Sequence, residues 1–85
     1  MPTVKEHEDL IKGIDNLLAT EGEEAGQWVV GTWTAKELLL NGGMPNTENN
    51  WNYILHVMRM FYPDSTWERG SRDEGWKVRV RIRTK

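Results

Sequence analysis

The stretch Trp76-Lys77-Val78-Arg79-Val80-Arg81-Ile82-Arg83 alternates apolar and basic side chains without interruption. Because successive side chains of a β-strand point to opposite faces, this pattern predicts a strand with one face in the core and one basic face. A partner strand is predicted from Ser65 to Arg69, and residues 70–75 are expected to form the connecting loop. The C-terminal part of the chain is therefore predicted to be a β-hairpin.

A helix is predicted before this hairpin, between Pro45 and Pro63, with Asn46 or Thr47 as its N-cap. Its apolar side chains fall within one sector of about 120° on a helical projection; they are Trp51, Ile54, Leu55, Met58, Phe61 and Tyr62. The opposite sector is nearly uncharged, although an exposed helix face usually carries Glu and Lys. This sector contains Asn49, Asn52, Tyr53, His56 and Met60, with Arg59 at its edge.

The N-terminal segment predicts another amphipathic helix. Thr3 and Glu6 have the spacing of a capping box, in which each side chain satisfies a backbone N–H at the helix start. The apolar residues that follow recur at intervals of three and four: Leu10, Ile11, Ile14, Leu17 and Leu18. We expect the helix to end before Gly22, in a polar loop formed by residues 21–24.

Between these two helices the sequence predicts a short strand and a short helix. Residues 27–31 are rich in β-forming side chains and include a glycine at their end. Thr34 and Glu37 form a second capping box, and residues 41–43 end the helix with Asn-Gly-Gly. The buried side of this helix is expected to come from Leu38, Leu39 and Leu40.

Composition limits the classes of protein to which the chain can belong. With 85 residues it is expected to form one small domain, residues 1–85. It has no cysteine, which excludes disulfides, thiolate catalysis and Cys-ligated zinc and fits a reducing, cytoplasmic location. No apolar run is long enough for a membrane span or a signal-peptide core.

The net charge of −2 hides an uneven distribution. Residues 1–49 contain three basic and nine acidic side chains, a net charge of −6, whereas residues 50–85 contain eight basic and four acidic ones, a net charge of +4. A protein with one positive side can bind a polyanion locally although the whole chain is acidic. The plainer interpretation is a solvated domain with a charge dipole.

No arrangement of residues predicts an enzyme, a cofactor or a small-molecule substrate. Gly42-Gly43 lacks the Lys-Ser/Thr of a phosphate-binding loop. His7 and His56 fall on different predicted helices and lack metal-ligand spacing. Ser65 and Ser71 have no candidate base to activate them. We therefore expect a binding protein.

The predicted elements follow one another as a helix, a short strand, a short helix, a glycine-containing turn, a longer helix and a hairpin. This order, over residues 3–85, resembles the winged helix-turn-helix superfamily, and residues 34–39 (Thr-Ala-Lys-Glu-Leu-Leu) resemble the opening of the second helix in that family. The resemblance implies an α+β fold with three helices and a small antiparallel sheet. In such a fold the first strand pairs with the terminal hairpin, which is called the wing.

The resemblance also implies recognition of duplex DNA, by the third helix in the major groove and by the wing. Asparagine can pair with adenine edges, and Arg and Lys around the wing can contact phosphates or the minor groove. The residues implied to contact DNA are Asn49, Asn50, Asn52, Tyr53, His56, Arg59, Arg69, Arg72 and Lys77. The chain is then expected to be a small transcriptional or recombination regulator, typical in its compact length of a phage or mobile element. One such module contacts a limited area of DNA, so a homodimer or cooperative neighbours are expected.

Other interpretations of the same residues remain open. The asparagines can serve only as N-cap and first-turn residues. Arg79, Arg81 and Arg83 can form a solvated strand face that discourages edge pairing, and Arg72 can pair with an acidic neighbour in the loop. The alternative function is a protein-binding winged helix, an adaptor or inhibitor whose acidic N-terminal half binds a basic partner.

Overall fold

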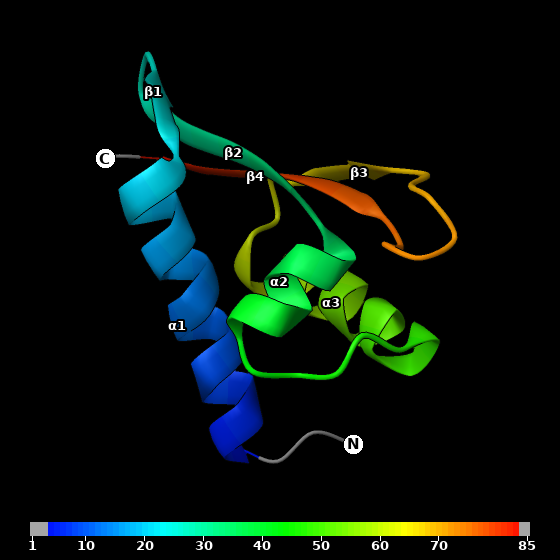
Figure 1. The fold of residues 1–85 in the computed structure, drawn as a ribbon. Coiled ribbons are helices and arrows are strands. Elements are labelled where there is room, and N and C mark those ends of the chain that lie inside the picture. The colour runs from blue at the N-terminus through cyan, green and yellow to red at the C-terminus, as the bar shows by residue number, and fades with distance from the viewer. Residues whose placement is uncertain (1–3, 84–85) are drawn as a thin grey trace.

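Three helices lie on one side of a four-stranded antiparallel sheet in the computed structural model, which describes residues 4–83 (Figure 1). The α+β class, with three helices and a small antiparallel sheet, is as the sequence predicts. Thr3, half of a predicted capping box, lies outside the described residues. In chain order the elements are α1 (Val4–Glu21), β1 (Glu23–Ala25), β2 (Trp28–Thr34), α2 (Ala35–Asn41), α3 (Glu48–Phe61), β3 (Thr66–Glu68) and β4 (Lys77–Arg83).

The alternating stretch forms β4, an interior strand of the sheet, whose strand order is β1-β2-β4-β3. β4 pairs along its whole length with β2, from Trp28 opposite Arg83 to Thr34 opposite Lys77. Its valines face the core and are fully buried, while the basic side chains alternate with them on the other face. The alternating sequence pattern predicts both faces of β4. A shift of the strand by one residue would turn the valines outward and the arginines into the core, so this register is strongly favoured.

The predicted polar loop at residues 21–24 is wrong. Glu23–Ala25 instead forms β1, which pairs with β2 through a turn containing Gly26 at φ +65°. Strand pairing uses backbone groups, so an exposed edge strand can form from residues of low β-propensity. Residues 4–83 therefore contain one strand more than the predicted order, and β2 continues past Gly31 to Thr34.

Two helix caps agree with the sequence. The Thr34 hydroxyl accepts from the Glu37 N–H at 3.1 Å, and the Glu37 carboxylate accepts from the Thr34 N–H at 3.3 Å, which completes the capping box of α2. At the start of α3, the Thr47 hydroxyl accepts from the Asn50 N–H at 3.2 Å. One expectation for α2 is wrong, since Leu40 is 56% exposed. Consecutive helical side chains point about 100° apart, so one buried face cannot include three in a row.

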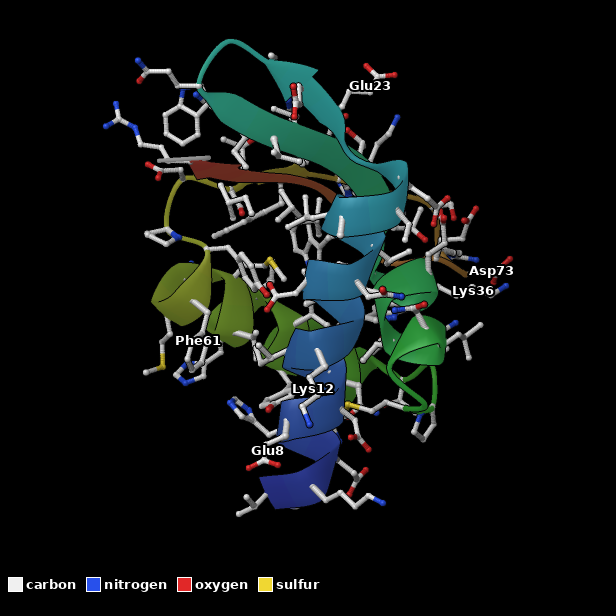
Figure 2. The ribbon with its side chains drawn as sticks, turned by 90° about the vertical axis from the view of Figure 1, so that its left-hand side faces the viewer. Glu8, Lys12, Glu23, Lys36, Phe61 and Asp73 are labelled. Carbon is white, nitrogen blue, oxygen red and sulfur yellow. The ribbon has the colours of Figure 1, made fainter. Side chains whose placement is uncertain are left out.

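The buried arc of α3 differs from the predicted sector at two positions. Ile54, Met58 and Tyr62 are buried as predicted. Phe61 is 49% exposed because it lies in the last turn, at the margin of the core, and Figure 2 shows it at the outside of the molecule. Val57, which the predicted sector omits, is fully buried. α3 is contacted by α2 and, at its end, by α1, so its buried arc is wider than one neighbour alone would require.

Candidate nucleic-acid interface

Three of the predicted contact residues form an exposed stripe on α3. Asn49, Asn52 and His56, here called the α3 stripe, recur at helical spacing and are all exposed. They line a shallow hollow of about 730 Å³, together with the segment that precedes α3 and Glu6 of α1. The stripe offers amide and imidazole groups that can donate and accept hydrogen bonds.

Two other predicted residues, Asn50 and Tyr53, form side-chain hydrogen bonds within the protein. The Asn50 side-chain amide donates to the Pro45 carbonyl at 2.8 Å and so stabilises the turn before α3. The Tyr53 hydroxyl forms a hydrogen bond with His7 Nδ1 of α1. Burial, and secondly the nearby Glu6 carboxylate, raise the pKa of Tyr53 above its ordinary value. These contacts position α3, and the α3 stripe is the part of its polar face that stays accessible.

The hairpin loop between β3 and β4 is attached to the start of α3. The Asn46 side chain accepts from the Trp51 indole N–H at 2.6 Å and donates to the Asp73 carbonyl at 2.8 Å. The Trp51 ring also lies against Gly75, where a Cβ atom would be 2.8 Å from ring atoms. The first two N–H groups of α2 donate to carbonyls at the end of this loop, at 2.7 and 3.0 Å. Figure 2 accordingly shows Lys36 of α2 on the same side of the molecule as Asp73.

Two of the predicted phosphate contacts belong to this loop. Arg69 and Arg72 are exposed and line a second hollow, of about 490 Å³, with Trp51 and Trp76. Glu48, the first residue of α3, lies on the same hollow. The loop thus places two guanidinium groups near the N-terminal turn of α3, where the helix dipole also favours an anion.

The remaining predicted residues lie apart from the α3 stripe. Arg59 places its guanidinium 5.5 Å from the centre of the Trp67 ring on β3. Lys77 begins β4 and shares the outer face of the sheet with its cross-strand neighbours Glu68 and Thr34. The structure therefore divides the predicted contact residues among α3, the hairpin loop and the sheet.

Sequence reasoning missed an aromatic and basic arrangement on the outer face of the sheet. Arg81 lies 4.2 Å and Arg83 5.1 Å from the centre of the Trp28 ring of β2. The alternation in β4 predicts a basic face, but the β2 side chain that meets it depends on the register between two distant strands. Trp28 has no other signal in the sequence than its place in a predicted strand.

Among the residues that the structure describes, no group of His, Asp and Glu side chains is placed to hold a metal ion. Helices with the length and hydropathy needed to cross a bilayer are likewise absent from residues 4–83. Comparison of the chain with protein-family models, with curated proteins and with solved structures finds no match.

Proposed function

We propose that the chain is a DNA-binding protein of the winged helix-turn-helix type, a small transcriptional or recombination regulator. With β1 set aside, the order α1, β2, α2, α3, β3, β4 is the order of that fold, and β2 pairs with the terminal hairpin as the fold requires. β1 is then an addition at the edge of the sheet. This order supports α3 as the recognition helix and residues 69–76 as the wing.

The observation that carries the proposal is the attachment of a loop with two exposed arginines to a helix whose α3 stripe presents amide and imidazole groups. Asn46 and Trp51 hold the loop against the start of α3. Arg69 and Arg72 therefore stay near the helix end that begins the α3 stripe. A guanidinium can bind phosphate while amides and an imidazole reach base edges, which is how DNA-binding proteins separate positioning from sequence reading.

Two carboxylates reduce the affinity of this surface for DNA of arbitrary sequence. Glu6 lies on the hollow of the α3 stripe, and Glu48 lies on the hollow of the loop. Each repels a nearby phosphate. Because non-specific affinity depends on phosphate contacts, we expect it to be low. A DNA sequence whose bases the protein recognises is expected to be bound much more tightly, by a homodimer or by cooperative neighbours.

The test is a titration of labelled duplex DNA, of random sequence and of a sequence selected from a random pool, at several salt concentrations. We expect a log–log slope of several units, reduced by about one in Arg72→Ala because one phosphate contact is lost. Lys12→Ala removes the same charge from α1, where Figure 2 shows Lys12 at the surface, and leaves the slope unchanged. Saturating protein that gives no signal at about 50 mM salt would contradict the proposal.

Base reading is tested separately with the double variant Asn52→Ala/His56→Ala. Both side chains are exposed, so the stability of the fold is expected to change by less than about 0.5 kcal/mol for each. The affinity for the selected sequence falls by about tenfold or more, because a good base contact contributes about 1–3 kcal/mol of discrimination. The affinity for random duplex and the salt slope stay as in the wild type. Equal losses on both DNAs are the result that speaks against base reading.

A second candidate function, binding of a basic protein, is favoured by the edge of the sheet. β1 is an edge strand with all of its residues exposed, among them Glu23 and Glu24. A partner strand can pair with such an edge and place basic side chains against the carboxylates. If the duplex titration is silent, partner capture with the wild type and with Glu23→Gln/Glu24→Gln tests this adaptor or inhibitor function. A partner retained by the variant would argue against it.

A further inference from the structure

The outer face of the sheet carries a row of basic side chains on β4. Arg79, Arg81 and Arg83, here called the arginine row, alternate with side chains that face the core. Figure 1 shows the helices on the other side of the sheet, so the arginine row forms a surface separate from the α3 stripe. We infer that this face binds single-stranded nucleic acid, a function that goes beyond the duplex recognition proposed above.

The spacing of the arginine row fits an extended chain of phosphates. Side chains on one face of a strand recur about every 6.7 Å. This repeat is comparable to the distance between successive phosphates of an extended single strand. β2 pairs with β4 along its whole length, whereas β3 pairs only with residues 77–79. Arg79 therefore lies in the interior of the face, and Arg81 and Arg83 continue the row beyond the end of β3. The strands of a duplex curve around the helix axis, so a duplex meets a straight row at fewer points.

In the register of the described strands, no carboxylate lies directly opposite a residue of the arginine row. The cross-strand neighbours of Arg79 are Thr32 on β2 and Thr66 on β3, both uncharged. The register places the carboxylates of this face on the two edge strands, Glu23 on β1 and Glu68 on β3. Attraction between the arginine row and a phosphate chain is therefore opposed mainly at the edges of the sheet.

Trp28 and two hollows add room and stacking surface for bases. The Trp28 ring lies within cation–π distance of both Arg81 and Arg83, which orients the guanidinium groups along the face. Hollows of about 480 and 340 Å³ both border Arg79 and Thr32, one toward β3 and one toward β1. Their carboxylates lie at the margins of the face, Glu68 in the first hollow and Glu21 and Glu23 in the second. Proteins that bind single strands combine a cationic track with aromatic side chains on which bases stack. An acidic peptide would match the charges alone, so the combination favours a nucleic acid.

The experiment measures the fluorescence anisotropy of a labelled oligothymidine of about 12 nucleotides at several salt concentrations. We expect binding with a log–log slope near −2, since about three phosphates each contribute about −0.7. Arg79→Gln/Arg81→Gln weakens binding by about tenfold or more, because two phosphate contacts are lost. Asn52→Ala/His56→Ala, the variant that tests duplex reading, leaves the affinity for this oligonucleotide unchanged. The two proposals can therefore fail independently of each other.

Lys5→Gln/Lys12→Gln is the control with the same total charge as the sheet variant, and it is expected to bind like the wild type. Circular dichroism and thermal unfolding establish that each variant is folded. A further variant, Trp28→Phe, tests base stacking, because it is expected to reduce the quenching of tryptophan emission by the oligonucleotide. The inference is overturned if the wild type fails to bind at about 50 mM salt, or if Arg79→Gln/Arg81→Gln binds as tightly as the wild type. Equally effective displacement of the oligonucleotide by polyglutamate would assign the face to acidic proteins instead.

Discussion

At the scale of single residues, the Tyr62 hydroxyl connects the end of α3 to α1. It donates to the Asp15 carboxylate at 2.6 Å, and the residue is buried. Burial, followed by the hydrogen bond and the charge of Asp15, raises the pKa of Tyr62 well above its ordinary value of 10.0. A phenol that ionises less readily in the folded state favours folding below its unfolded pKa. This contribution is lost as the pH rises above that value.

We therefore expect the free energy of unfolding to fall above about pH 10, and to fall less steeply in Tyr62→Phe. At pH 7 this variant loses a hydrogen bond to a carboxylate, at a cost of about 1–2 kcal/mol. Tyr53→Phe is the comparison, because the pKa of Tyr53 is also raised but its side chain is only half-buried, so a smaller change of slope is expected. Urea unfolding between about pH 7 and pH 11 measures the three curves. Parallel curves for the wild type and Tyr62→Phe would show that the pKa of Tyr62 does not differ between the folded and the unfolded state.

At the scale of elements, the contact between the hairpin loop and α3 depends on a glycine. Gly75 has φ +72°, and a Cβ atom there would lie 2.8 Å from ring atoms of Trp51. Gly26, in the turn between β1 and β2, has φ +65° but no atom of the described residues within 4 Å of its Cβ position, chain neighbours aside. Alanine at either position incurs the left-handed penalty of about 1–2 kcal/mol. Only at Gly75 must the alanine methyl group also displace the Trp51 indole.

Gly26→Ala is thus expected to lower the free energy of unfolding by about 1–2 kcal/mol, and Gly75→Ala by about 2–4 kcal/mol. Gly75→Ala is also expected to change tryptophan emission and to weaken duplex binding, since Arg72 is no longer held near α3. Urea unfolding followed by fluorescence measures both variants. Equal losses of stability, with unchanged emission, would mean that Trp51 does not hold the loop.

The elements that sequence predicts well are those that neighbouring residues decide. The capping box at Thr34 and the alternation of residues 76–83 are local patterns, and the structure contains both. β1 follows no such pattern, because it pairs through its backbone at an exposed edge. The attachment of the loop joins Asn46 to Asp73, 27 positions apart, and no local rule brings them together. Sequence reasoning therefore identified the polar face of α3 but not its connection to the hairpin loop.

At the scale of the whole molecule, the charges are separated by element. Acidic side chains predominate on α1 and β1, whereas basic ones gather on β4. The net charge of −2 alone predicts repulsion from a polyanionic surface at pH 7. A protein approaches such a surface through its most complementary side, and screening within about 10 Å at 0.1 M salt limits the contribution of the far side. We therefore expect the chain to be retained by a cation-exchange resin at pH 7 and low ionic strength.

Two double variants with the same total charge test whether the arrangement of charge or the net charge decides retention on the resin. Arg79→Gln/Arg81→Gln removes two positive charges from the sheet, and Lys5→Gln/Lys12→Gln removes two from α1, so each changes the net charge from −2 to −4. If the arrangement of charge decides retention, the sheet variant elutes early and the α1 variant elutes close to the wild type. Coincident elution of the two variants would mean that the total charge governs the interaction. In that case the position of the arginines on the outer face of the sheet would not contribute to binding of polyanions.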